Sequence, residues 1–123
     1  MFITGCDNIK IQPEKGPSMT EKFLTALKEA GIEVEEEPIG GEIIGAETGF
    51  KFTINGEVID VYEYDLTSDN EKTVQFLSEI RANGKINPFG YEVAVLLNKS
   101  LALANYENHS MKDRIIEIFG SVK

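Results

Sequence analysis

The stretch FKFTINGEVIDVYEYD, residues 50–65, decides the fold. Apolar and polar residues alternate on both sides of Asn55-Gly56, a dipeptide that favours a two-residue β-hairpin turn. Pairing outward from this turn gives three cross-strand pairs: Ile54 with Glu57, Phe52 with Ile59 and Phe50 with Val61. Because side chains alternate between the faces of a strand, the five apolar members of these pairs share one face. We assign that face to the core.

The other face of this hairpin mixes charged, hydroxyl and aromatic side chains: Lys51 opposite Asp60, then Thr53, Val58, Tyr62 and Tyr64. An exposed aromatic and polar sheet face suits contact with a protein or a glycan. Val58, Tyr62 and Tyr64 are therefore the candidate partner-binding residues, and Tyr91 and Tyr106 join them if a second hairpin forms. The alternative is that the N-terminal segment or a second copy of the chain covers this face.

Three further segments carry a helix-start signal, a serine followed three residues later by an acidic residue. These pairs are Ser18 with Glu21, Ser68 with Glu71, and Ser110 with Asp113. Each segment has an apolar stripe and a glycine at its end. The stripes are Met19, Phe23, Leu27 and Ala30; Val74, Leu77 and Ile80; and Met111, Ile115, Ile118 and Phe119; the stops are Gly31, Asn83-Gly84 and Gly120. The sequence predicts three amphipathic helices.

Strands are also expected at residues 32–36 and 43–46, which Pro38 and Gly40-Gly41 separate. Residues 91–106 fit either a helical stripe or two strands joined at Asn98-Lys99, and we choose the hairpin. The order of elements then predicts an α+β fold, with an antiparallel sheet of about four to six strands and three helices packed mainly on one face.

Composition limits the possible partners. The 123 residues suit one domain, and a 41% apolar share is enough for a core. A formal charge of −9 repels phosphate backbones, so we expect no nucleic-acid partner. One cysteine permits no internal disulfide, and no stretch of the sequence has the roughly 20 apolar residues that span a bilayer.

The N-terminal residues Ile3-Thr4-Gly5-Cys6 resemble a bacterial lipobox, in which the cysteine thiol receives a diacylglycerol. In this interpretation residues 1–6 are the end of a signal peptide whose basic start lies upstream, and Cys6 is the lipid attachment site. The polar residues 7–17, with two prolines and a glycine, form a tether to a domain at 18–123. Two acyl chains on one cysteine anchor a protein firmly to a membrane. The alternative is that Cys6 is an ordinary buried thiol in a short N-terminal strand.

Two stretches, INGEVIDVYEYD (54–65) and LNKSLALANYENHSMKDRIIEIF (97–119), resemble small lipoproteins of Gram-positive bacteria. The resemblance covers roughly residues 20–120. It implies the predicted fold and an extracytoplasmic, lipid-anchored location, and it implies no reaction and no catalytic residues.

The sequence contains no convincing catalytic, metal or cofactor constellation. His109 is the only histidine, and its place before Ser110 favours a helix-entry role over catalysis. The acidic stretches EVEEEP and DLTSDNE lack the spacing of a calcium loop, and Gly40-Gly41 with Gly45 indicates turns rather than a phosphate loop. Strand alternation separates Asp60 from Glu63 and Asp65, which weakens a paired-carboxylate site.

These observations favour a lipid-anchored, extracytoplasmic domain that binds an envelope protein, a peptide or a glycan and catalyses no reaction. The rival is a soluble cytoplasmic regulatory or inhibitor protein that acts through its acidic surface. A hydrolase that uses Asp and Glu side chains is the third hypothesis.

Overall fold

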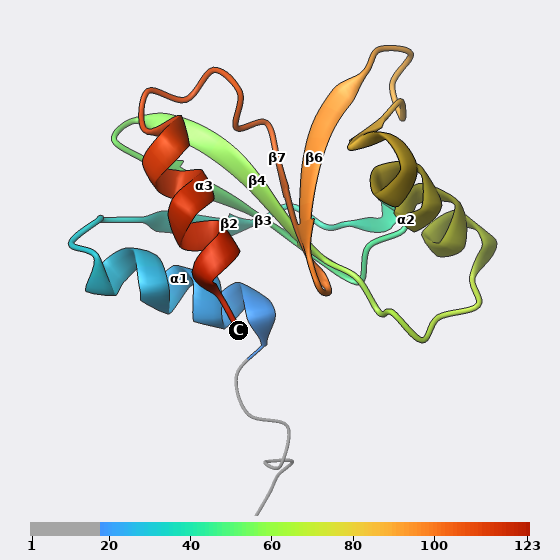
Figure 1. Cartoon of the computed structure of the whole chain (residues 1–123), viewed down its shortest axis with the longest axis horizontal. Helices are drawn as coiled ribbons and strands as arrows, with labels where there is room; N and C mark the ends of the chain where they lie inside the picture. Colours follow the sequence, from blue (N-terminus) through green and yellow to red (C-terminus); the bar gives the residue numbers. More distant parts are fainter. Residues whose placement is uncertain (1–17) are drawn as a thin grey trace, which may run out of the picture.

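The computed structural model describes residues 18–123, so Cys6, the lipobox and the tether at 7–17 lie outside the described residues. The elements follow in the order α1 (Met19–Glu29), β2 (Glu35–Pro38), the 3-10 helix η2 (Glu42–Ile44), β3 (Thr48–Ile54), β4 (Glu57–Glu63), α2 (Glu71–Asn83), β5 (Lys85–Ile86), β6 (Val93–Asn98), β7 (Leu101–Ala104) and α3 (Lys112–Ser121) (Figure 1). Over this part of the chain, six antiparallel strands form one sheet in the order β2-β3-β4-β7-β6-β5. The predicted α+β class is confirmed.

The central hairpin forms in the predicted register. Ile54 pairs with Glu57, and the ladder continues through Phe52–Ile59 and Phe50–Val61 to the last pair, Thr48–Glu63. Asn55 and Gly56 in the turn both have positive φ, 56° and 77°, as a type I′ turn requires. The predicted core face is buried, except that Phe50 is half-buried at its edge.

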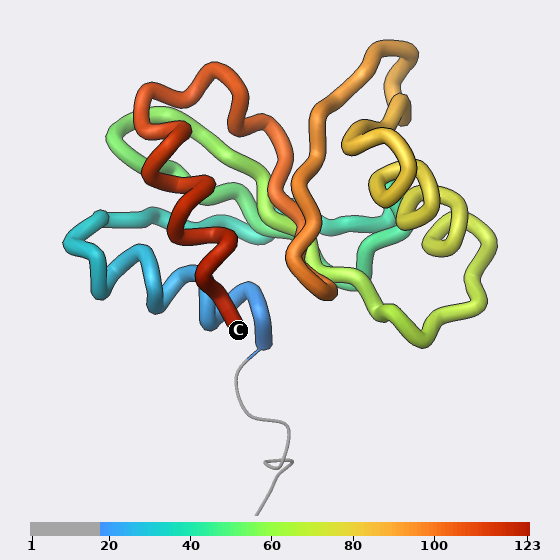
Figure 2. Tube along the Cα trace, viewed as in Figure 1, coloured from blue at the N-terminus to red at the C-terminus, as the bar shows by residue number. Residues whose placement is uncertain are grey.

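Apolar side chains fill both faces of the sheet, and the helices divide between them. Figures 1 and 2 show α1 and α3 together on one side and α2 on the other. On the first face, Phe23 of α1 stacks on Phe52 and meets Phe119 of α3 edge to face, with ring centroids 5.9 and 5.5 Å apart. On the second face, α2 and η2 cover a separate cluster that contains Tyr64. Two helices thus share a face, and the third gives the opposite face a core of its own.

Two strand predictions need correction. Residues 43–46 form no strand, because Ile44 and Ala46 both donate their N–H groups to the Gly41 carbonyl, which closes the turn of η2. The strand predicted at 32–36 runs instead from Glu35 to Pro38. Pro38 is tolerated there because β2 is an edge strand.

The hairpin at 91–106 is confirmed over β6 and β7. Its turn is Lys99-Ser100, one residue later than expected, and Lys99 takes the positive φ of 56°. Asn98 is the last residue of β6, and its side chain donates to the Phe119 and Val122 carbonyls, both at 2.9 Å. This contact joins the hairpin to the end of α3.

One of the three predicted caps is confirmed. Ser18 and Glu21 form the complete capping box of α1. The cap of α2 is Asn70, whose side chain accepts from two backbone N–H groups, and Ser68 instead accepts from the Asn70 N–H. In that helix Leu77 and Ile80 of the predicted stripe are buried, but Val74 is exposed, and Phe76 is buried in its place.

Candidate partner-binding surface

Tyr64 was predicted to be exposed, and this was wrong. Tyr64 is 2% exposed, and its hydroxyl donates to the Ile44 carbonyl at 2.9 Å. Burial raises the pKa of Tyr64 well above its usual value. Because α2 and η2 cover this end of the sheet, Tyr64 cannot contact a partner without local unfolding.

Of the other tyrosine predictions, only Tyr62 and Tyr91 remain accessible. Tyr106 is buried with the cluster under α1 and α3. Tyr62 is half-buried, and burial, with a smaller contribution from Asp60, raises its pKa to about 12. Val58 is also half-buried and lies four residues from Tyr62 on the same face of β4, near the hairpin turn.

Four exposed apolar residues form a patch beside Tyr62. Phe89 and Tyr91 are 56% and 62% exposed, and their ring centroids lie 5.9 Å apart. Ile39 and Ile43, 42% and 61% exposed, line a shallow hollow of about 100 Å³ together with Phe89 and Tyr62. We call Ile39, Ile43, Phe89 and Tyr91 the apolar patch.

Local sequence places these side chains outside the core. Phe89 and Tyr91 flank Gly90, which has a φ of +86°, in the segment NPFGY that leads into β6. Ile43 lies in η2, where the single helical turn buries Ile44 and leaves its neighbour outside. Phe89 and both isoleucines were not predicted from the sequence as binding residues. An aromatic residue between proline and glycine was the available signal, because a turn rarely buries its apolar side chains.

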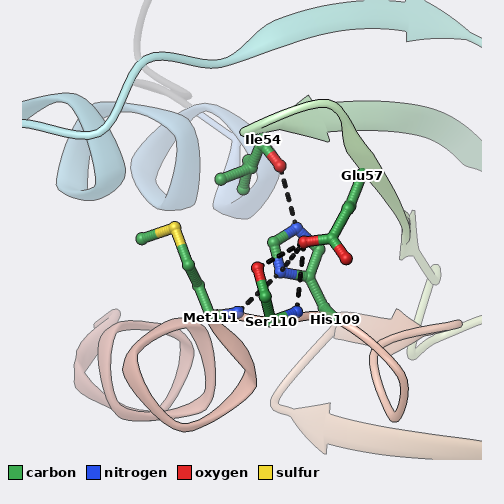
Figure 3. A network of polar contacts seen from close by, with 5 residues as sticks. All are labelled: Ile54, Glu57, His109, Ser110 and Met111. Carbon is green, nitrogen blue, oxygen red and sulfur yellow. Dashed lines mark hydrogen bonds and ion pairs between the residues drawn. The ribbon is translucent and has the colours of Figure 1, made fainter.

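His109 occupies a buried polar network at the start of α3, shown in Figure 3. A carbonyl can only accept, so Nε2 of His109 donates to the Ile54 carbonyl at 3.0 Å. The other ring nitrogen, Nδ1, accepts from the Met111 N–H at 3.0 Å. Both nitrogens have partners in the backbone, which confirms the predicted helix-entry role.

Ser110 does not cap α3 with Asp113, which is a further correction. Its hydroxyl and its N–H both donate to Glu57 at the start of β4. These hydrogen bonds, with a smaller contribution from His109, hold the pKa of Glu57 below its usual value. Glu57 Oε1 also lies 3.7 Å from Nδ1 of His109. Serine, histidine and carboxylate are close here, yet neither ring nitrogen is available to activate the serine hydroxyl.

The acidic residues considered for hydrolysis lie on different faces of the sheet. Asp60 lies beside Lys51, and burial raises its pKa while Lys51 opposes the shift. Glu63 faces α1, where its carboxylate accepts from the N–H and the hydroxyl of Thr20 at 3.0 and 2.8 Å. Within residues 18–123, no group of three or more His, Cys, Asp and Glu side chains could hold a metal ion.

No family model matches this chain, and searches of curated proteins and of solved structures find no match. None of the described helices is long and apolar enough to span a bilayer.

Proposed function

We propose that this chain is a lipid-anchored, extracytoplasmic domain that binds an envelope partner through the apolar patch. The observation that carries the binding role is the exposed ring pair of Phe89 and Tyr91 next to Ile43. Clustered exposed apolar side chains mark interaction sites on proteins, whereas single ones are ordinary. Aromatic rings also supply much of the binding free energy at protein interfaces.

The position of the patch supports this arrangement. Figure 1 shows the loop before β6 at the upper right and the start of α1 at the bottom of the molecule. If the chain is anchored at Cys6, the anchor is linked to the domain through residue 18, at the start of α1, whereas Phe89 and Tyr91 lie in the loop before β6. The charge of −9 keeps the domain away from anionic headgroups, which leaves the patch accessible to a partner.

The anchor is tested by intact-mass measurement of the protein extracted from native membranes. We expect the mass of a diacylglyceryl group on Cys6, and we expect Cys6→Ser to move the protein to the soluble fraction. An unmodified thiol in a soluble protein would contradict the anchor and support the rival, an acidic cytoplasmic regulator.

The binding surface is tested in cells by photo-crosslinking from a benzophenone residue placed at position 43. We expect a crosslinked partner of defined mass, which the double substitution Phe89→Ser and Tyr91→Ser removes. Val74→Ser is the matched control, because Val74 is 49% exposed on α2 outside the patch. An adduct that persists in the double variant, or that Val74→Ser removes as well, would contradict the proposal.

A further inference from the structure

We propose that the free edge of β2 binds an extended basic peptide segment of another protein. The peptide adds as an antiparallel strand beside β2 and places an arginine or lysine next to Glu36. This proposal depends neither on the anchor nor on the apolar patch, because β2 lies at the edge of the sheet and uses different residues.

The backbone of β2 presents unpaired groups at this edge. Ile39 N–H donates to the Gly49 carbonyl, so Ile39 and Gly49 form a hydrogen-bonded pair. In an antiparallel ladder every second pair is hydrogen-bonded, so the next such pairs are Glu37 with Lys51 and Glu35 with Thr53. Glu35 and Glu37 therefore bond to β3, and the N–H and C=O of Glu36 point away from the sheet. All four residues of β2 are exposed. A peptide residue opposite Glu36 can thus exchange two backbone hydrogen bonds with it.

The side chain of that peptide residue would enter an acidic cavity. Paired residues on antiparallel strands share a face, and Glu36 lies on the same face as its partner Phe52, towards α1. On this face, between α1 and the sheet edge, is a cavity of about 440 Å³. Leu24 and Phe50 give it apolar walls, and Glu21, Glu36, Glu47 and Glu63 give it carboxylates. The methylene chain of an arginine or lysine can pack against the apolar walls, and its charged group can reach the carboxylates.

Within residues 18–123, two of these side-chain carboxylates have no partner. Glu63 is bonded to Thr20, and Glu21 completes the capping box of α1. The side chains of Glu36 and Glu47 form no hydrogen bond or ion pair with any other residue of the described part of the chain. They remain available for a cation from outside.

A second hollow extends the site along β2. It has a volume of about 840 Å³; Ile32 and Val34 give it apolar walls, and the rest of its lining includes Lys28, Glu33, Glu35 and the hairpin turn. Val34 is two residues from Glu36, so the peptide residue two positions after the basic one lies opposite it. This arrangement favours an apolar residue at that position.

Charge excludes a second copy of the chain as the occupant. Two β2 edges paired with each other would bring three consecutive glutamates of each chain together, and like charges opposed across strands are destabilising. Such charges protect edge strands from self-association, and the same charges attract a basic segment. The opposite edge of the sheet, β5, has two residues and offers too little backbone for this mode.

The test is a ¹⁵N NMR titration of the full chain, residues 1–123, with the peptide acetyl-Thr-Thr-Thr-Arg-Thr-Val-Thr-amide. We expect the amide resonance of Glu36 to move downfield and the shifts to concentrate on β2 and α1. A citrulline peptide keeps the shape of arginine without its charge, and we expect about tenfold weaker binding. An arginine N-methylated on its backbone nitrogen cannot donate to the Glu36 carbonyl, and we expect it to abolish binding.

Glu36→Gln should weaken binding of the arginine peptide about fivefold and leave binding of the citrulline peptide unchanged. Glu107→Gln, an exposed glutamate outside the site, is the matched control. No shift of the Glu36 amide, equal binding of the arginine and citrulline peptides, or normal binding of the N-methylated peptide would overturn the proposal. Binding that occurs only after removal of residues 1–17 would overturn it too, because the chain itself would then occupy the edge.

Discussion

His109→Ala should remove a large share of the stability of this domain. The side chain is fully buried, at 0% exposed, and its ring bonds to the Ile54 carbonyl and to the Met111 N–H, both at 3.0 Å. Without the ring, two backbone groups in or near the core lose their partners, at a cost of about 1 kcal/mol each. Lost packing adds about 1 kcal/mol, so we expect the free energy of unfolding to fall by about 3 kcal/mol.

Urea unfolding followed by circular dichroism measures this loss. The slope of the free energy of unfolding against urea concentration should be the same in the variant and the wild type. His109→Asn places an oxygen near Nδ1 and keeps the Met111 bond, whereas His109→Gln places a donor near Nε2 and keeps the Ile54 bond. Each should therefore lose about half as much as the alanine variant. Asn108→Ala, at an exposed neighbour, is the control. An alanine variant within about 0.5 kcal/mol of the wild type would refute this account of the network.

Three further predictions concern stability. Because the pKa of Glu57 is lowered in the folded state, its carboxylate stabilises the fold above the unfolded-state pKa, and this contribution is lost as the pH falls through the folded-state pKa. The urea midpoint of the wild type should therefore exceed that of Glu57→Gln above about pH 5 and approach it below about pH 4. Ser110→Ala should lose much of the same pH-dependent difference in urea midpoint. A difference between wild type and Glu57→Gln that does not change with pH would contradict the role of the Glu57 carboxylate. Asn98→Ala removes two hydrogen bonds to the end of α3 and should lower the free energy of unfolding by about 1–2 kcal/mol. A loss below about 0.3 kcal/mol in urea unfolding would contradict this prediction. In Gly49→Ala the new Cβ would overlap the Gly40 carbonyl, so we expect a loss of about 2–3 kcal/mol in thermal unfolding, and a neutral result would show that the loop before β3 can move.

The sequence predicted correctly where neighbouring residues decide the conformation. Asn55-Gly56 sets a turn whose geometry fixes the register, and strand alternation then assigns Phe52 and Ile59 to one face. Ser18 has its capping partner three residues away, so α1 also begins where expected. His109 at the entrance of α3 was predicted from position alone, although its bond to Ile54 was not.

Predictions failed where another residue, near or distant, competed for the same group. Ser110 has the spacing of a cap, yet Glu57, 53 positions away, accepts both of its hydrogen bonds. Ser68 has the same spacing, and Asn70 caps α2 because its side chain is nearer the first free N–H groups. Phe89 became a candidate binding residue only once the chain placed it beside Ile43.

By itself, then, the sequence determined the α+β class, the central hairpin and its register, because alternation and turn chemistry act over a few residues. The tertiary structure alone decided which side chains of the face under α2 are covered and which stay exposed. Tyr64 and Tyr62 lie close together in one acidic, aromatic stretch, and η2 and α2 bury the first while the second lines the hollow beside the apolar patch. Burial depends on which remote segments pack over a side chain, and no local pattern contains that information.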